Sequence, residues 1–282
     1  MTLVPRTDGH LVTDVGLMRR MMPYLMPTRT ESVVLHRALY DLTRTLPWLE
    51  HYNATHEPKA TLFHLLLFAC GRALHERPGL NRFVSGARIY QRSCVQLSFV
   101  AKTAFADGAP FVTVKVTIPA EQTFPECVDM IVRAIGSARH GEKTEVDTEL
   151  RLAFAVPSFV LRTAVRALRR LDSVNLLPAS MIRPDPMFTS LFLANLGSVG
   201  IDDTFHHLYE WGNCPLFGAM GQAKKHVLVG ESGGPEVRDA MNVNWTFDER
   251  INDGLYCMSS LAIAQRIFED PEGDDGAPAL TR

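Results

Sequence analysis

The sequence has little of the features that would assign a protein class directly. Only five of its 282 residues are cysteine. They are scattered, their number is odd, and none of them forms a CxxC pair. These features argue against a disulfide framework and against a structural zinc site, and they predict a reducing, cytoplasmic location.

Long hydrophobic runs and charge of one sign are also lacking. The N-terminus has no apolar signal-peptide core, and the uncharged run Thr61–Gly71 is far shorter than the about 20 residues that cross a bilayer. A net charge of -2 predicts no general attraction to nucleic acid. With 46% hydrophobic and 21% charged residues, the composition is that of an ordinary globular protein with one large domain or two small ones.

Apolar periodicity predicts an α/β fold with a mixed, mostly antiparallel sheet and packed helices. The segment Phe111–Ile118 alternates apolar and polar residues, as expected of a strand with one buried face. The segment Thr61–Arg77 is apolar nearly all round, which predicts a buried helix that stops at Pro78. Further strands are predicted at 33–42, 82–91, 95–102, 216–222, 226–229 and 241–248, and further helices at 43–53, 124–138 and after 254.

A polar turn interrupts the C-terminal pattern between two apolar segments. The residues Val243, Trp245 and Phe247 alternate with polar ones, and a helical spacing follows Gly254. Between them lies the sequence DERINDG, which ends at Gly254. Polar turns held by buried elements often carry chemistry, so we take this turn as the first candidate site.

The loop GSVGIDDTFHHLYEWGN is the second candidate, because it is rich in Gly, Asp, His and aromatic residues. His206 and His207 would supply a base if the loop folds over the turn. Paired loop histidines are more often solvated or packed on aromatic rings. With Glu210 they do not have the spacing of a strong metal site, so we expect no metal.

The segment 153–177 is an amphipathic, basic pattern. Four arginines lie away from an apolar face: Arg162, Arg166, Arg169 and Arg170. Two interpretations stay open: a surface helix that packs on the core or on a partner subunit, and a peripheral contact with an anionic membrane.

Several motifs together resemble one family. The segments RALHERPGLNRFVSGARIYQR, FLANLGSVG, PLFGAMGQ and NWTFDERINDGLY are similar, in order, to the catalytic core of the dihydrolipoyl acyltransferases of 2-oxoacid dehydrogenase complexes. They are more distantly similar to chloramphenicol acetyltransferases. The resemblance covers Val33 to Phe268 and is greatest to stand-alone members that lack lipoyl and subunit-binding modules, which implies no covalent lipoyl group.

The resemblance implies an acyl transfer that uses coenzyme A or acyl-CoA. The family has a His-x-x-x-Asp-Gly motif whose histidine is the base. Here Asp253 and Gly254 match, but Glu249 stands where the histidine is expected. The family's oxyanion-stabilising Ser or Thr corresponds to Ala194, so Asn195 or Ser198 would have to substitute. The family also implies that Asp253 pairs with an early arginine, for which Arg29 is the candidate.

The exchange of histidine for glutamate has an energetic consequence. A thiol has a pKa of about 8.5, a histidine about 6.5 and a glutamate about 4.3, so the proton transfer is uphill by about 2.7 kcal/mol to histidine and about 5.7 kcal/mol to glutamate. Burial would narrow this gap. If the strand continued through the turn, Glu249 would share the buried face of Trp245, whereas a nearby arginine would hold it ionised.

Two hypotheses therefore remain. The first is an acyltransferase with a modified site made of Glu249, Asp253, Asn195, Ser198 and the two histidines. The second is a non-catalytic subunit of the same fold that is structural or that binds CoA or an acyl ligand. The resemblance implies a homotrimer, or a larger cage, with the site between subunits. The expected organisation is an arm at 1–27, a domain at 28–269 with an inserted helical segment at about 145–186, and a tail at 270–282.

Overall fold

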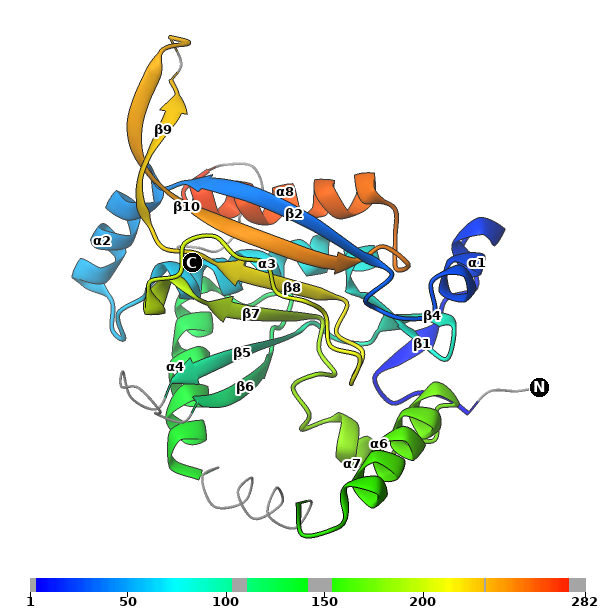
Figure 1. The fold of residues 1–282 in the computed structure, drawn as a ribbon. Helices are drawn as coiled ribbons and strands as arrows, with labels where there is room; N and C mark the ends of the chain where they lie inside the picture. The colour runs from blue at the N-terminus through cyan, green and yellow to red at the C-terminus, as the bar shows by residue number, and fades with distance from the viewer. Residues whose placement is uncertain (1–3, 103–110, 142–153, 231, 274–282) are drawn as a thin grey trace.

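The computed structural model describes residues 4–102, 111–141, 154–230 and 232–273. Its elements follow one another along the chain as shown in Figure 1. The strands are β1 (Gly9–Leu11), β2 (Val33–Asp41), β3 (Arg82–Ser85), β4 (Arg88–Arg92), β5 (Gln96–Lys102), β6 (Phe111–Thr117), β7 (Leu191–Asn195), β8 (Leu216–Met220), β9 (Lys224–Val229) and β10 (Pro235–Asp248). The helices are α1 (Leu17–Leu25), α2 (Thr45–Thr55), α3 (Leu62–Glu76), α4 (Phe124–Gly141), α6 (Ser158–Ser173), α7 (Ala179–Ile182) and α8 (Gly254–Glu269), with 3₁₀ turns at Pro78–Asn81 and Gly197–Val199.

The main sheet has the order β2-β10-β8-β7-β5-β6, and β9 also pairs with β10. The pairs β5–β7 and β7–β8 are parallel, and the others in this sheet are antiparallel. A smaller antiparallel sheet has the order β1-β4-β3. The predicted mixed, mostly antiparallel α/β architecture is therefore confirmed.

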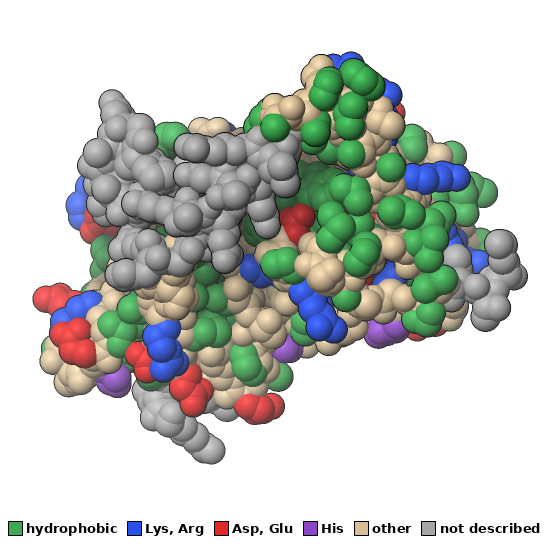
Figure 2. Space-filling model, turned by 90° about the horizontal axis from the view of Figure 1, so that it is seen from below, with side chains coloured by type: hydrophobic (Ala, Val, Ile, Leu, Met, Phe, Trp, Pro, Cys, Tyr) green, Lys and Arg blue, Asp and Glu red, His purple; other side chains and the backbone are tan. Residues whose placement is uncertain are grey.

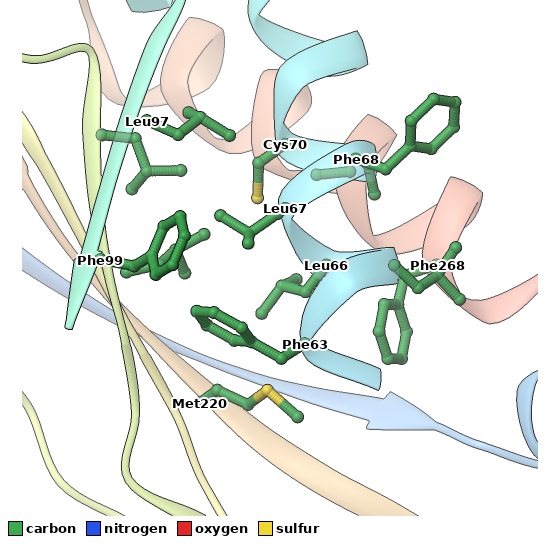
Figure 3. Packing of buried hydrophobic residues seen from close by; sticks show 14 of the residues in the cluster. Phe63, Leu66, Leu67, Phe68, Cys70, Leu97, Phe99, Met220 and Phe268 are labelled. Carbon is green, nitrogen blue, oxygen red and sulfur yellow. The ribbon is translucent and has the colours of Figure 1, made fainter. Parts of the chain in front are cut away.

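The core lies between one face of the main sheet and the helices α3, α4 and α8. In Figure 3, Phe63, Leu66 and Leu67 of α3 point toward Leu97 and Phe99 of β5. On the other side of α3, Phe268 of α8 completes the packing (Figure 3). Because α3 meets the sheet on one side and α8 on the other, its apolar residues are buried nearly all round, as its composition predicts.

The element β10 connects the core to the candidate site. It is 14 residues long, with Val243, Trp245 and Phe247 fully buried on the helix side. Its first half forms a hairpin with β9 that projects from the body (Figure 1), and its far end enters the DERINDG turn. The turn thus lies at the edge where α1 and the small sheet also gather (Figure 1).

Two segments differ from the predictions. The expected strand 82–91 is a hairpin, because Gly86 and Ala87 both have positive φ, at 54° and 58°, and reverse the chain between β3 and β4. The arm at 1–27, for which no strand was predicted, contains β1, which pairs with β4. Within the described residues, no helix is long and apolar enough to cross a membrane.

Candidate functional site

The turn after β10 is held by a buried ion pair on either side of Glu249. Asp248 and Arg250 have side chains that are 1% and 3% exposed. Arg250 Nε donates to Asp248 Oδ1 at 2.8 Å and Nη2 donates to Oδ2 at 2.7 Å, which is a bidentate arrangement. Arg250 Nη1 also donates to the Met26 carbonyl at 2.9 Å, which connects the turn to the end of α1. The turn is therefore held by the ion pair of Asp248 and Arg250, whose charges neutralise each other.

Glu249 has a fixed backbone and a free carboxylate. Its N–H donates to the Ser32 carbonyl at 3.0 Å, and its own carbonyl accepts from Arg19 of α1. Its side chain is half-buried, because β10 ends at Asp248 and Glu249 does not continue the buried face of Trp245. The carboxylate makes no hydrogen bond or ion pair with any residue that the structure describes, so the expectation that an arginine would hold it is not met by Arg250.

Asp253 is the N-cap of α8. Its carboxylate accepts from the Tyr256 N–H at 2.8 Å, which satisfies one of the unpaired donors of the first helical turn. Arg29 instead donates to the carbonyls of Tyr209, Glu210 and Gly212, at 3.1, 3.2 and 2.7 Å. The predicted ion pair between Arg29 and Asp253 is thus absent from the described part of the chain, because each group already has other partners.

Asn195 and Ser198 lie at the end of β7 and contact each other. The Ser198 N–H donates to Asn195 Oδ1 at 3.1 Å, and Ser198 Oγ donates to the Asn195 carbonyl at 2.8 Å. Asn195 is half-buried and Ser198 is exposed, whereas Ala194 before them is buried. The Nδ2 amide of Asn195 makes no hydrogen bond with the described residues, so it is a free donor.

The sheet register places the Asn195 amide far from the Glu249 carboxylate. Asn195 pairs with Met220, and Met220 pairs with Val243 of β10. Glu249 follows Val243 by six positions, which corresponds to about 20 Å along a strand. Within one chain, Glu249 and the Asn195 amide lie at opposite ends of the sheet and do not meet.

The two histidines lie on the sheet face away from the helices. The His206 ring stacks on Phe217 with centroids 3.9 Å apart, and its Nδ1 donates to the His207 carbonyl at 2.8 Å. Burial lowers the pKa of His206, a shift that the His207 carbonyl opposes, so the imidazole is neutral at pH 7. Phe217 pairs with Thr246, three residues before Glu249. His206 is therefore closer to the turn than Asn195 is, but it is packed against aromatic rings.

The Glu210 carboxylate binds Thr30 and does not face the two histidines as a metal ligand. Its carboxylate accepts from the N–H and the hydroxyl of Thr30, at 3.1 and 3.2 Å. No group of three His, Cys, Asp or Glu side chains that could hold a metal is found in the part of the chain that the structure describes.

Sequence reasoning missed the residues that shape this region. The charges of Asp248 and Arg250 on either side of Glu249 are a sequence signal for an ion pair in this turn, but they do not show which carboxylate Arg250 binds. The three carbonyl contacts of Arg29 had no local signal, since they join residues about 180 positions apart.

Comparisons with known proteins give the fold. No family model matches the chain, and no curated protein matches its sequence.

Solved structures are similar along nearly the whole length of the chain, and three of them illustrate the fold. The cubic core of the pyruvate dehydrogenase multienzyme complex has 13% identity, covers 96% of this chain and 98% of its own, and has a TM-score of 0.60. The dihydrolipoamide acetyltransferase of Azotobacter vinelandii has 14% identity, 96% and 98% coverage and a TM-score of 0.60. A chloramphenicol acetyltransferase has 13% identity, 93% and 98% coverage and a TM-score of 0.55.

Proposed function

Because the chain has the fold of the 2-oxoacid dehydrogenase acyltransferase cores and of chloramphenicol acetyltransferase, we propose that it is an acyl-CoA-dependent acyltransferase. Its active site forms between two copies, with Glu249 of one copy as the base. Asn195 or Ser198 of the other copy stabilises the oxyanion. The acyl acceptor is a thiol or another small nucleophile.

The observation that supports this proposal most is the placement of the two free groups. The Glu249 carboxylate and the Asn195 amide each lack a partner among the described residues, and they lie about 20 Å apart by register. A second copy can bring one group to the other. In the A. vinelandii acetyltransferase a serine, a histidine and an asparagine have been examined for their role in catalysis, and the last two are four positions apart. Glu249 and Asp253 have the same spacing.

The chemistry needs one proton transfer in each direction. The Glu249 carboxylate takes the proton of the acceptor thiol, and the sulfur forms a bond to the carbonyl carbon of the acyl-CoA thioester. The negative oxygen that develops accepts a hydrogen bond from the Asn195 amide or the Ser198 hydroxyl, a contact of a kind typically worth about 2.7 to 4 kcal/mol. The bond from carbon to the CoA sulfur then breaks, and that sulfur recovers the proton from Glu249.

The proposed site needs a second subunit to be complete. Glu249 is half-buried, so a partner subunit must exclude water from it to make the carboxylate an effective base. Asp253 orients the turn by capping α8 and not through Arg29. His206 is the second candidate base, because its Nδ1 is a donor and its Nε2 is therefore free to accept a proton.

The projecting hairpin supports assembly into a homotrimer. Val227 of β9 is paired with Val237 of β10, so both lie on one face together with Val229. These three side chains are 67–78% exposed. Contiguous exposed apolar groups of this kind mark subunit contacts. One protein with this fold forms a cubic core, which extends the proposal to a larger cage.

The alternative is a non-catalytic subunit of the same fold that binds CoA or an acyl ligand. The replacement of histidine by Glu249 and the buried Ala194 at the position of the family's hydroxyl residue favour it.

A second proposed property is peripheral membrane contact through α6. It is favoured by the composition and exposure of this helix, which has no buried residue and carries four arginines.

The test compares wild type with Glu249→Gln. Purified protein is mixed with acetyl-CoA and dihydrolipoamide, and thioester formation is followed. We expect turnover in the wild type and a loss of about 100-fold or more in the variant, since a positioned base contributes typically 10²–10⁴-fold. Unchanged turnover in Glu249→Gln would show that Glu249 is not the base, and His206→Asn is the variant to compare with it. Saturable CoA binding without turnover in the wild type would favour the non-catalytic subunit.

A further inference from the structure

A small pocket lies behind the turn, between α1, α6 and the loop before β8. Its volume is about 270 Å³, and its walls include Arg29, Arg169, Arg250, Phe188 and Trp211. Pockets for drug-sized ligands have about 300–1,000 Å³, so this pocket suits a smaller molecule. It is formed by one chain, and neither Glu249 nor Asn195 lines it.

Two glycines in the walls of the pocket bring backbone segments into close contact. Gly86 has a φ of 54°, and a Cβ on it would lie 1.9 Å from the Ser173 carbonyl oxygen of α6. Gly212 has a φ of 76°, and a Cβ there would lie 2.4 Å from the Met187 carbonyl oxygen. Both glycines line the pocket. A larger residue at either position would force these segments apart and change the shape of the pocket.

The charges around the pocket do not balance. Arg250 is neutralised by Asp248. Asp172 and Asp8 share Arg6, at 2.9 and 2.8 Å, and Arg92 lies 3.9 Å from Asp8, so these four charges also balance. This leaves Arg29 and Arg169 against the single carboxylate of Glu210. Arg169 is exposed and makes no hydrogen bond or ion pair with the residues that the structure describes.

Arg29 is a buried charge without an adjacent carboxylate among the described residues. It is only 7% exposed, and the three hydrogen bonds that it donates all go to uncharged carbonyls. No carboxylate of the described residues lies within 4.0 Å of it, although Asp248 and Glu210 act on it from further away. A buried charge without an adjacent counter-charge is costly, and a bound anion would supply that charge.

An aromatic wall faces the same space. The rings of Phe188 and Trp211 meet edge to face with centroids 6.0 Å apart. Trp211 Nε1 donates to Asp185 Oδ2 at 2.6 Å, which fixes the indole. This wall offers a flat apolar surface beside two guanidinium groups.

We propose that this pocket is a binding site for a small organic anion, whose carboxylate or phosphate group meets Arg29 and Arg169 and whose apolar body rests on Trp211. Neither Glu249 nor Asn195 lines the pocket, so this proposal does not depend on Glu249 acting as a base. Arg250 forms part of its wall and is the residue after Glu249, so the ligand binds next to the turn.

Tryptophan fluorescence and calorimetry on the full chain test the site. Trp48 and Trp245 are buried in the core, whereas Trp211 lines the pocket. The probes are benzoate, phenyl phosphate, inorganic phosphate and the neutral benzyl alcohol. We expect benzoate or phenyl phosphate to bind saturably and to change the fluorescence, and benzyl alcohol to bind at least about tenfold more weakly. Comparison of benzoate with phenyl phosphate identifies the preferred anionic group, and inorganic phosphate measures what the apolar body adds. In Trp211→Phe, calorimetric binding should remain and the fluorescence change should disappear.

Two charge reversals on α6 form a matched pair. Arg169→Glu removes a pocket charge, and Arg166→Glu removes an exposed charge that does not line the pocket. We expect Arg169→Glu to weaken anion binding by about tenfold or more and Arg166→Glu to leave it within about twofold. Equal losses in both variants would overturn the site, as would equal binding of benzyl alcohol, or no saturable binding of any anion up to roughly 10 mM.

Discussion

At the scale of single residues, three consecutive side chains at the end of β10 have different environments. Asp248 and Arg250 are buried and neutralise each other, whereas Glu249 between them is half-buried and free. The strand ends at Asp248, and the turn that follows directs the next two side chains differently. The charged composition of the turn could be read from the sequence, but which carboxylate is paired could not, because a bidentate pair depends on backbone angles that the turn alone sets.

The buried His64 of α3 leads to a prediction about how stability depends on pH. Its Nδ1 accepts from the Thr61 N–H at 3.1 Å in a capping box, and burial lowers its pKa to about 4. In the unfolded chain the pKa of His64 is about 6.5, and in the folded chain it is about 4. The stabilisation that the neutral imidazole provides is therefore fully present above pH 6.5 and is lost as the pH falls from about 6.5 toward 4. At pH 5 the expected loss in free energy of unfolding is about 2 kcal/mol.

His64→Gln is the variant to compare, since glutamine at this position preserves a capping box and does not titrate. Urea unfolding at pH 7.5 and pH 5 measures both proteins. The fall in stability between these pH values should be smaller in the variant by about 2 kcal/mol. An equal fall in both proteins would contradict a buried neutral histidine at this position.

At the scale of elements, strongly periodic segments were predicted well and backbone reversals were not. The alternation in β10 and the apolar surface of α3 identified both elements, because each buries a face that the period defines. The β3–β4 hairpin was predicted as one strand because its two-residue turn contains Gly86 and Ala87, and alanine carries no turn signal. The strand β1 lies in a polar stretch, where the ion pair of Arg6 and Asp8 at 2.8 Å is buried against the small sheet.

The helix α6 is attached mainly at its C-terminal end, where Asp172 pairs with Arg6. Phe159 near its start is 70% exposed. Figure 2 shows hydrophobic side chains next to lysine and arginine side chains on the face seen from below, the side on which α6 lies in Figure 1. This combination is typical of helices that lie on an anionic membrane surface.

We therefore expect the protein to float with vesicles that contain anionic lipid and not with zwitterionic vesicles. The triple variant Arg162→Gln, Arg166→Gln and Arg170→Gln should lose most of this binding, since each basic residue near the surface contributes about 1 kcal/mol. Arg169 is left intact because it lines the pocket. If the wild type fails to float with anionic vesicles, the membrane interpretation is wrong, and α6 is a surface helix that packs on the core or on a partner subunit.

At the scale of the whole molecule, the two halves of the proposed active site lie at opposite ends of one sheet. The strands β7, β8 and β10 pair in a register that places Asn195 beside Met220 and Val243, far from Glu249. A rigid sheet cannot bring its own ends together. A closed assembly of identical chains can place one end of a sheet against the opposite end of another.

Mixed assemblies test this arrangement. Glu249→Gln and the double variant Asn195→Ala with Ser198→Ala should each be inactive alone. Co-expressed in equal amounts as a trimer, they should recover about one quarter of wild-type activity, because random assembly gives that fraction of interfaces with both native groups. The same mixture made from separately assembled trimers is the control. Absence of any recovery would mean that both groups do not act across one interface.

The sequence by itself determined the α/β class, the periodic elements and the residue types of the turn, because these depend on local periodicity and on short motifs. Similarity to a known family implied where chemistry would occur, with Glu249 expected at the position of that family's histidine. Only the tertiary structure decided which charges are paired, that Asp253 caps α8 while Arg29 binds carbonyls, and that Glu249 and Asn195 are far apart. These properties depend on strand register and on contacts between residues distant in sequence, which local patterns do not encode.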